Sequence, residues 1–473
     1  MTKPHAQPPS PWATFALCSG AFYLTTLDLS IVNVAFPEII AEFGVSRAEA
    51  SWVVTTYNIF YASLLVVAGK SADTFGRRRL FRLGVTLFAA GSLMAATAPS
   101  LAFLIGGRAV QGIGGAILTP ATLGLLIAAF PAERRTQVVA MWGGIAALGV
   151  ASGPSIGAFV ISLDDWRAAF WINVPAVAFI LALSGRFLAK SQIWPASHRP
   201  DYLGAVMITT GLAATALGIS QSDVWGWVDL RTLGSLAAGV GVLAWFLRRQ
   251  RSHPEPILDL KLFHNRSFQV ANFSSLLFFA GFAAIGLNNM LFLRQVWGYD
   301  VLTAGLLTAV APATVALCSP LAGKLATQFG FRLFVTIGPV VVASISLAFT
   351  LLLHADPRPG LFVALGIVMA VGIAGFIPVN TAAAVAELPP PQLSVGGGIN
   401  NTFRQVGSVL GVAALVAVLG SPNTPTALLS AHHRGWVFIA IAMLGAAAMG
   451  VRQLGAGFTV GPASPTAASV DTH

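Results

Sequence analysis

The sequence predicts an all-α integral membrane protein in which two parallel six-helix halves are joined through an inserted pair of helices. Three observations support this fold class: the composition of the 473-residue chain, its number of long apolar stretches, and an internal repeat. Apolar residues make up 56% of the chain and charged residues 9%. Soluble domains average about 45–50% apolar residues and about 25% charged residues. The composition therefore excludes a water-soluble enzyme and, because of its aliphatic content, a disordered chain.

Fourteen apolar stretches of about 20 residues are bounded by charged residues, proline or glycine. About 20 apolar residues in a helix cross a bilayer, and none of the stretches has the alternating period of a membrane β-strand. The predicted spans are 12–36, 50–69, 80–98, 101–129, 136–162, 167–188, 202–221, 231–247, 268–293, 301–326, 333–354, 360–386, 396–420 and 435–452. The first stretch is too long for a signal-peptide core, so we interpret it as a retained span.

The basic residues orient these spans. If both termini are cytoplasmic, the termini and even-numbered loops hold 19 of the 27 Lys and Arg residues, the odd-numbered loops hold six, and two lie within spans. The positive-inside rule predicts this distribution for 14 transmembrane spans with both termini cytoplasmic. Topology thus explains the net charge of +10. Nucleic acid is not an expected partner, because the basic residues are spread over many loops.

An internal repeat divides the chain. The segment GKSADTFGRR at 69–78 recurs as GKLATQFGFR at 323–332, with six of ten positions identical. A coincidental similarity of two loops is the alternative. Against it, both copies join equivalent spans (2 to 3 and 10 to 11), both lie on the predicted cytoplasmic side, and the starts of spans 1 and 9 are separated by about the same number of residues. Two parallel six-helix repeats are the layout of an alternating-access transporter. The predicted parts are a cytoplasmic N-terminus (1–11), an N-terminal half (12–190), an inserted two-helix linker region (191–266), a C-terminal half (267–454) and a disordered cytoplasmic tail (455–473).

Several segments carry patterns that can be compared with known families. They are LDLSIVNVAFP at 27–37, the loop 69–79, RAVQGIGG at 108–115, the Gly/Pro-containing segment 149–158, WR and NVP between 166 and 175, and NTFRQVG at 401–407. Together they resemble the major facilitator superfamily, specifically its 14-span drug:proton antiporter branch. Ser30, Phe36 and Ala158 depart from the branch's usual Thr, Leu and Gly. The resemblance covers nearly the whole chain and implies the major facilitator fold.

Asp28 is the only carboxylate within the predicted spans. A charge at the centre of a spanning helix costs about 2.5–3.5 kcal/mol, so we expect Asp28 to face a cavity and to have a partner. Arg108 lies at a similar depth, about 10–12 Å below the outer surface, and the resemblance implies that spans 1 and 4 are neighbours. Burial favours a neutral carboxyl and a nearby arginine favours a charged one, so a change in their separation would switch proton affinity. A fixed structural ion pair is the alternative.

The loop at 69–79 is a candidate cytoplasmic gate. Gly69 and Gly76 permit a tight turn, and Asp73 can accept hydrogen bonds from helix-start amides or from basic side chains. Arg77 and Arg78 also serve as orientation signals, so a purely topogenic role is the alternative. The second copy has Thr327 in place of the aspartate, which predicts a weaker latch there.

In span 5, Gly149, Gly153 and Gly157 recur every four residues beside Pro154. Small residues at this spacing allow close helix approach, and proline can kink a helix where a gate opens. Ordinary packing explains the stripe about as well, and the family resemblance favours a hinge.

Five polar or aromatic residues are candidates for a substrate cavity. Arg404 lies in span 13 without a carboxylate partner in the second half, so it either binds backbone carbonyls or attracts an anionic group on a substrate. The other candidates are Tyr57, Asn58, Tyr61 and Gln111. Aromatic residues in spans more often serve packing.

Catalytic chemistry is not predicted. The eight histidines are expected in loops, termini or span ends, and Cys18 and Cys318 lie in apolar runs, so neither a metal site nor an enzyme is expected. Gly69-Lys70-Ser71 is not a phosphate loop, because position 64 is leucine and there is no nucleotide-binding domain. No cofactor is expected, and an ion gradient is the expected energy source.

The predicted function is a proton-coupled antiporter that exports small hydrophobic or amphipathic compounds, such as drugs or secondary metabolites, by alternating access. The expected partners are a small-molecule substrate, protons and the lipid bilayer, with the chain working as a monomer in the plasma membrane, the bacterial inner membrane. A proton-coupled metabolite importer on the same fold and a transport-inactive sensor or scaffold are the alternatives.

Overall fold

The computed structural model describes residues 10–188, 201–254, 256–388, 393–422 and 424–452, which are almost entirely helical. The helices of the first part are α1 (Pro11–Phe43), α2 (Arg47–Phe75), α3 (Arg77–Ala96), α4 (Leu101–Ala129), α5 (Ala132–Leu163), α6 (Ala168–Trp171) and α7 (Asn173–Phe187). Next come α8 (Tyr202–Ser220), α9 (Ser222–Trp225), α10 (Leu230–Gln250) and the 3₁₀ turn η1 (Leu260–His264). The last six are α11 (Arg266–Gln295), α12 (Val301–Phe329), α13 (Phe331–Leu352), α14 (Pro359–Val385), α15 (Leu393–Leu419) and α16 (Pro425–Arg452).

Each predicted span corresponds to helix, and the all-helical membrane fold class is confirmed. Within the described residues, thirteen helices are long and apolar enough to cross a membrane, and α5 contains a shorter apolar segment, Leu148–Leu163. The sixth predicted span is divided into α6 and α7 at Ile172. The tails predicted at 1–11 and 455–473 lie outside the described residues, except for residues 10 and 11.

Several helices extend beyond the predicted spans. Pro37 does not end α1, which continues to a left-handed Gly44, so Glu38 and Glu42 also lie in this helix. The expectation that Asp28 is the only carboxylate in a spanning helix therefore holds for the apolar stretch and not for the whole of α1. A search for apolar stretches stops at charged residues. Such residues can still belong to the end of a spanning helix, because their side chains reach the membrane surface.

The two copies of the repeat have the same backbone geometry. Gly76 alone separates α2 from α3, with φ 96° and ψ 123°. Gly330 alone separates α12 from α13, with φ 87° and ψ 146°. A residue with a Cβ rarely adopts these angles, so glycine is required at both hinges.

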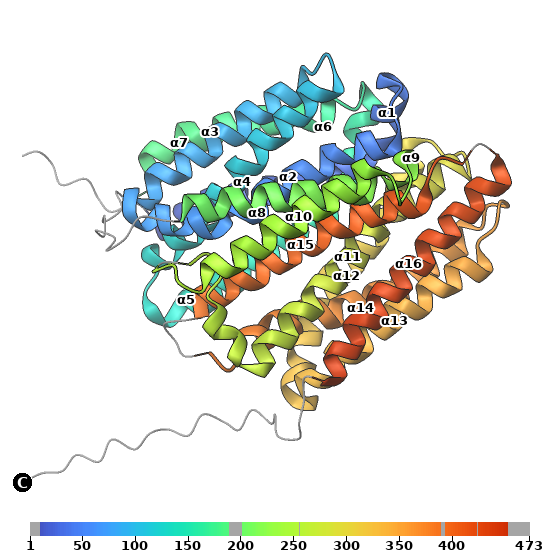
Figure 1. Ribbon diagram of the computed structural model, residues 1–473. Coiled ribbons are helices and arrows are strands. Elements are labelled where there is room, and N and C mark those ends of the chain that lie inside the picture. Colours follow the sequence, from blue (N-terminus) through green and yellow to red (C-terminus); the bar gives the residue numbers. More distant parts are fainter. Residues whose placement is uncertain (1–9, 189–200, 255, 389–392, 423, 453–473) are drawn as a thin grey trace, which may run out of the picture.

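The helices of each repeat pack mainly on one another. In the first, α1 packs on α5, and α4 packs on α2 and α3; in the second, α11 packs on α15 and α16, and α13 packs on α14 and α16. The contacts between the repeats are mainly α5 with α12 and α2 with α15. The inserted α8 and α10 pack on each other, and α8 also packs on α2 and α15. In Figure 1, α3 and α7 lie at one edge of the bundle and α13 and α16 at the opposite edge.

The two ends of the bundle differ in charge. At one end of the bundle, which we call the basic end, α1 begins and α10 and α16 end (Figure 1). At the other end, which we call the opposite end, α1 ends and α2 begins. The arginines at 77–79, 248, 249 and 251 lie at helix termini of the basic end.

Candidate functional site

Two oppositely charged side chains form a fully buried ion pair inside the first repeat. Arg108 on α4 donates through Nη1 to Oδ2 of Asp28 on α1, and the two side chains are 1% and 0% exposed. The sequence places these two residues at equal depth in neighbouring helices and so predicts that they meet. The structure confirms this contact. Their role in proton coupling stays a prediction.

Amide side chains complete the coordination of Asp28. Its Oδ1 accepts hydrogen bonds from Gln111 Nε2 and from Asn173 Nδ2, both at 3.1 Å. Both amides also donate to Ser92 Oγ, at 2.7 and 3.2 Å. We call Asp28, Ser92, Arg108, Gln111 and Asn173 the Asp28 cluster. It joins helices α1, α3, α4 and α7.

The guanidinium of Arg108 is held on several sides. Its Nε donates to the carbonyl oxygen of Val53 at 2.9 Å, and Nη1 donates to Gln111 Oε1 at 2.9 Å. Its central carbon lies 4.4 Å from the ring centroid of Tyr57 and 5.7 Å from that of Phe170. A buried ion pair is tolerated only when its other polar atoms are also satisfied, and these contacts meet that condition.

Sequence reasoning missed two members of the Asp28 cluster as site residues. Asn173 belongs to the NVP pattern, but the break at Ile172 that makes it the first residue of α7 does not show in the continuous apolar stretch predicted at 167–188. Ser92 also could not be identified as a site residue from the sequence, because the residues around it do not indicate which face of α3 packs on α4.

The proposed gate at 69–79 is a one-residue hinge rather than a loop. Helix α2 continues to Phe75, so the expectation that Gly69 forms a turn is wrong. Because no strong breaker follows Gly69 until Gly76, the helix runs on. Arg77 Nη1 donates to the carbonyl of Gly124 at 2.8 Å, which ties the start of α3 to α4.

Other parts of this segment differ in what the structure describes. Arg78 Nη2 donates to the carbonyl of Gly185 at 2.7 Å, linking α3 to α7. Asp73 belongs to α2, but its side chain lies outside the described residues, so the predicted latch stays untested.

The glycines of span 5 form the surface of α5 that faces α1. A Cβ added at Gly149 would lie 2.1 Å from Thr26 Oγ1, and one added at Gly153 would lie 1.7 Å from Ser30 Oγ. At Gly157 the nearest atom would be Ile31 Cγ1, at 2.6 Å. The stripe thus brings α5 against the part of α1 that carries Asp28.

Pro154 lies on α5 where this helix also meets α12. A Cβ added at Gly305 of α12 would lie 2.9 Å from the carbonyl oxygen of Pro154 and 2.2 Å from the Cβ of Ala158. Helix α5 is therefore closely packed on both sides, against α1 of its own repeat and α12 of the other. Its role as a hinge stays a prediction.

The predicted cavity residues on α2 are buried in this conformation. Tyr57 and Tyr61 stack with ring centroids 5.9 Å apart, and they are 0% and 4% exposed. The Tyr61 hydroxyl shares a hydrogen bond of 2.9 Å with Thr119 Oγ1. Tyr57 Oη and Asn58 Oδ1 have no hydrogen-bond partner among the described residues.

Arg404 lies on α15, partly exposed within the bundle. Its guanidinium carbon lies 4.3 Å from the ring centroid of Phe279, and its Nε has no hydrogen-bond partner in the described part of the chain. The structure places Gln111, the remaining predicted cavity residue, in the Asp28 cluster instead.

The second repeat contains a buried cluster of neutral polar groups. Asn380 Nδ2 and Asn400 Nδ2 donate to Ser275 Oγ at 2.7 and 3.0 Å. Asn400 Nδ2 also lies 3.2 Å from Asn272 Oδ1. These side chains come from α11, α14 and α15, and no ionised group takes part in the contacts described for them.

Two histidines contradict the expected distribution, since His432 and His433 both lie inside α16. His432 lies inside α16 and is fully buried, with Nδ1 2.9 Å from Asn288 Oδ1. The expectation is wrong because α16 begins at Pro425, ten residues before the predicted span. In the described residues, no three His, Cys, Asp or Glu side chains lie close enough together to hold a metal ion.

Polar contacts join the two repeats at the opposite end of the bundle. Arg294 Nη2 of α11 donates to Glu38 Oε1 of α1 at 2.5 Å. Arg47 at the start of α2 donates to Gln295 Oε1 at 2.6 Å and to the carbonyl oxygen of Gly420 at 3.0 Å. We call these residues the opposite-end clasp.

A helical bundle with an internal repeat and a buried polar cluster is a layout found in secondary transporters. The Major Facilitator Superfamily model matches residues 18–412 and 271–469. The chain belongs to the Major Facilitator Superfamily, and it is a multi-pass membrane transporter of a small-molecule substrate rather than an enzyme.

Relatives of this chain include drug-resistance exporters. It is 31% identical over 405 residues to multidrug resistance protein Stp of Mycobacterium tuberculosis (strain CDC 1551 / Oshkosh), covering 84% of this chain and 74% of the relative. It is 30% identical to the tetracenomycin C resistance and export protein of Streptomyces glaucescens, covering 87% and 76%. It is 28% identical to riboflavin transporter RibZ of Clostridioides difficile (strain 630), covering 89% and 91%.

The fold is also similar to a solved transporter. The crystal structure of an auto inhibited POT family peptide transporter superposes with a TM-score of 0.68 at 17% identity, covering 95% of this chain and 99% of that one. At this identity the similarity concerns the fold alone.

Proposed function

We propose that this protein is a proton-coupled antiporter of the 14-span drug:proton branch, which exports small hydrophobic or amphipathic compounds by alternating access. The buried Asp28–Arg108 pair is the observation that supports this function most strongly. A carboxylate in the membrane interior costs free energy that an apolar residue would not. The presence of Asp28 there therefore favours a role in ion movement.

Asp28 exchanges its proton through a movement of the helices. In the conformation described, the carboxylate is fully buried and both of its oxygens accept hydrogen bonds. A proton therefore reaches it only when the Asp28 cluster separates and water enters. Protonation then removes the charge that holds Arg108, which favours a second arrangement of α1 and α4. We propose that this exchange drives the cycle.

The contacts between the repeats support a rocking movement. The opposite-end clasp holds one end of the bundle closed, while α5 with α12 and α2 with α15 form the surfaces on which the repeats turn. With the basic end in the cytoplasm, as the positive-inside rule predicts, this conformation is closed to the outside. The protein then works as a monomer in the plasma membrane of a bacterium.

Two of the relatives support export of drugs or secondary metabolites, since the name of one specifies multidrug resistance and the name of the other specifies resistance and export. The riboflavin transporter among the relatives favours a second candidate, a proton-coupled transporter of a metabolite. Both candidates use the same fold and the same Asp28 cluster. They differ in the direction in which substrate moves relative to protons.

The test is transport in proteoliposomes that enclose a pH indicator, with an imposed proton gradient and a panel of fluorescent drugs. We expect substrate and protons to move in opposite directions. Asp28→Asn should abolish gradient-driven transport while leaving downhill substrate exchange. Asp356→Asn, at an exposed loop position, is the matched control and should transport normally.

Two outcomes would contradict the proposal. Gradient-driven transport retained by the Asp28→Asn variant would remove Asp28 from coupling and leave a structural ion pair. Movement of protons and substrate in the same direction would instead favour the metabolite symporter.

A further inference from the structure

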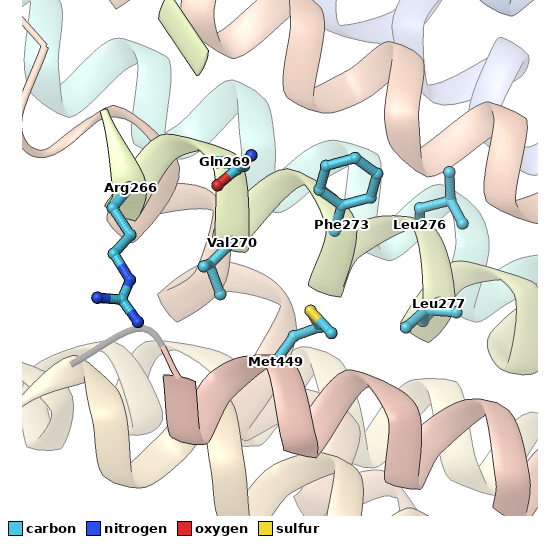
Figure 2. Close-up of a pocket in the computed structure, with 7 residues that line it drawn as sticks. All are labelled: Arg266, Gln269, Val270, Phe273, Leu276, Leu277 and Met449. Carbon is cyan, nitrogen blue, oxygen red and sulfur yellow. The ribbon is translucent and has the colours of Figure 1, made fainter. Parts of the chain in front are cut away.

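A groove with a volume of about 430 Å³ runs along α11 where this helix faces α16. Figure 2 shows Arg266 and Gln269 at one end of the groove and Leu276 and Leu277 at the other, with Met449 of α16 on the facing wall. The groove begins at the basic end of the bundle, because Arg266 is the first residue of α11. None of the Asp28 cluster or the predicted cavity residues lines it.

The length of the groove equals about one leaflet. Arg266 and Leu277 are eleven residues apart on one helix, which corresponds to about 16 Å at 1.5 Å per residue. Half of a hydrocarbon core about 30 Å thick is about 15 Å. The groove therefore extends from the membrane surface to about the bilayer midplane, the depth of a single acyl chain.

The lining changes from polar to apolar along this length. Arg266 and Gln269 are exposed at the surface end. Phe273, 43% exposed, Leu276 and Met449 provide apolar walls below them. A ligand that fits this gradient has a polar head and a hydrocarbon chain.

The charge at the mouth of the groove favours an anionic head. The Arg266 side chain makes no hydrogen bond or ion pair among the residues that the structure describes. Lys261, five residues before Arg266 and exposed, is a further basic residue of the segment that leads into α11. Basic clusters next to a spanning helix attract the anionic lipids of the cytoplasmic leaflet, and basic pockets between helices bind their head groups.

We propose that the groove between α11 and α16 is a binding site for one anionic phospholipid, with its phosphate against Arg266 and one acyl chain between Phe273 and Met449. Lipid is favoured over a soluble anion because the apolar part of the groove has the length of a leaflet. The proposed lipid site uses neither the Asp28 cluster nor the predicted cavity residues, so it does not depend on the proposed function.

The experiment is native mass spectrometry of the purified full-length protein with phosphatidylglycerol or phosphatidylethanolamine of identical acyl chains. We expect phosphatidylglycerol to be retained at least fivefold more. Arg266→Gln should remove most of this preference. Arg82→Gln is the matched control, because Arg82 is an exposed arginine near the basic end of α3, and it should leave the preference unchanged.

Two further variants test the apolar part. Met449→Trp fills the groove and should lower the retention of both lipids. Phe273→Ala removes one exposed wall of the groove and should also lower the retention of both lipids. It serves as the test if the tryptophan variant fails to fold. Asp28→Asn should bind phosphatidylglycerol normally, so the lipid site and the coupling proposal fail separately.

Equal retention of both lipids, or an unchanged preference in Arg266→Gln, would overturn the proposal. Unchanged retention in a folded Met449→Trp or Phe273→Ala variant would also overturn it. Displacement of the bound lipid by an uncharged fluorescent drug at comparable concentration would assign the groove to drug entry instead.

Discussion

Asp28 illustrates how one buried charge depends on residues from three other helices. The sequence predicted its pairing with Arg108 because helix depth can be counted along the chain. The hydrogen bonds from Gln111 and Asn173 could not be predicted, because they depend on the rotation of α4 and on the break before α7. The polar environment of the carboxylate is therefore a product of tertiary structure.

Removing only the positive member of the pair should be strongly destabilising. Arg108→Gln leaves Asp28 buried without a counter-charge, which costs about 3–5 kcal/mol in buried pairs. The double variant Asp28→Asn/Arg108→Gln should recover a large part of this stability, because neither charge is then unpaired. Thermal unfolding of the four proteins in detergent measures the cycle. Equal stability of Arg108→Gln and the double variant would mean that an unpaired Asp28 is not what destabilises the single variant.

At the scale of the helix, the two repeats use the same close packing. Gly149 and Gly153 bring α5 against α1, and Gly407 and Gly411, 258 residues later, bring α15 against α11. The spacing of the span 5 glycines predicted close approach, and the structure identifies α1 as the partner. The partner could not be read from the stripe, since any smooth helix surface accepts it.

The glycine surface of α15 gives a prediction with a control on the same helix. A Cβ at Gly411 would lie 2.1 Å from the carbonyl oxygen of Ala280, a backbone atom, so Gly411→Ala should destabilise the protein by about 1–3 kcal/mol. Gly397→Ala meets no atom within 4 Å and should be neutral or slightly stabilising, because alanine favours helix. Thermal unfolding distinguishes them, and equal melting temperatures would show that α15 is not closely packed.

The inserted helices depend on an aspartate that the sequence did not single out. Asp201 caps α8 at Gly204 N and accepts hydrogen bonds from Gln250 Nε2 at 2.8 Å and from Arg249 Nη1 at 2.7 Å. Burial alone raises the pKa of this carboxyl, but the hydrogen bonds from Gln250, Arg249 and Gly204 outweigh it and leave the pKa below its usual value.

This lowered pKa predicts a loss of stability in acid. The carboxylate is stabilised by folding, so its contribution is complete above the unfolded pKa of about 3.9 and is lost as the pH falls through the lower folded value. Asp201→Asn should therefore be less stable at neutral pH and should show a smaller further loss below about pH 4. A variant whose acid unfolding curve parallels that of the wild type would exclude this role.

At the scale of the whole molecule, the opposite-end clasp joins the two repeats at one end of the bundle, so we expect it to favour closure of that end. Glu38 and Arg294 are partly exposed, so their ion pair contributes up to about 1 kcal/mol, which corresponds to roughly a fivefold change in a two-state equilibrium. Glu38→Gln should therefore raise the population open at that end. Spin labels at Ala41→Cys and Leu306→Cys, on α1 and α12, measure it as a longer distance.

The control for this experiment is Glu49→Gln, since Glu49 caps α2 without contacting the second repeat in the described hydrogen bonds. It should leave the distance distribution unchanged. An unaltered distribution in Glu38→Gln would mean that the packing of α5 on α12 alone keeps this end closed.

The sequence predicted the order of the spans because each must be apolar over a bilayer's thickness, and thirteen of the fourteen are long apolar helices among the described residues. It failed at helix ends, where α1 passes Pro37 and α16 begins early enough to include His432. It also did not predict the clasp, because Glu38, Arg47 and Arg294 each look like ordinary surface charges until the repeats meet. The division of the chain into halves and the side of its termini stay predictions.

The neutral amide cluster of the second repeat has a consequence for how such proteins diversify. Ser275, Asn380 and Asn400 occupy an interior without an acid in their hydrogen-bond network, whereas the first repeat holds Asp28. If the proton-coupling group lies in the first repeat, the second repeat is not required to keep an ionisable residue. We expect natural selection to alter ligand preference chiefly through exchanges in the second unit, leaving the ion-handling unit intact.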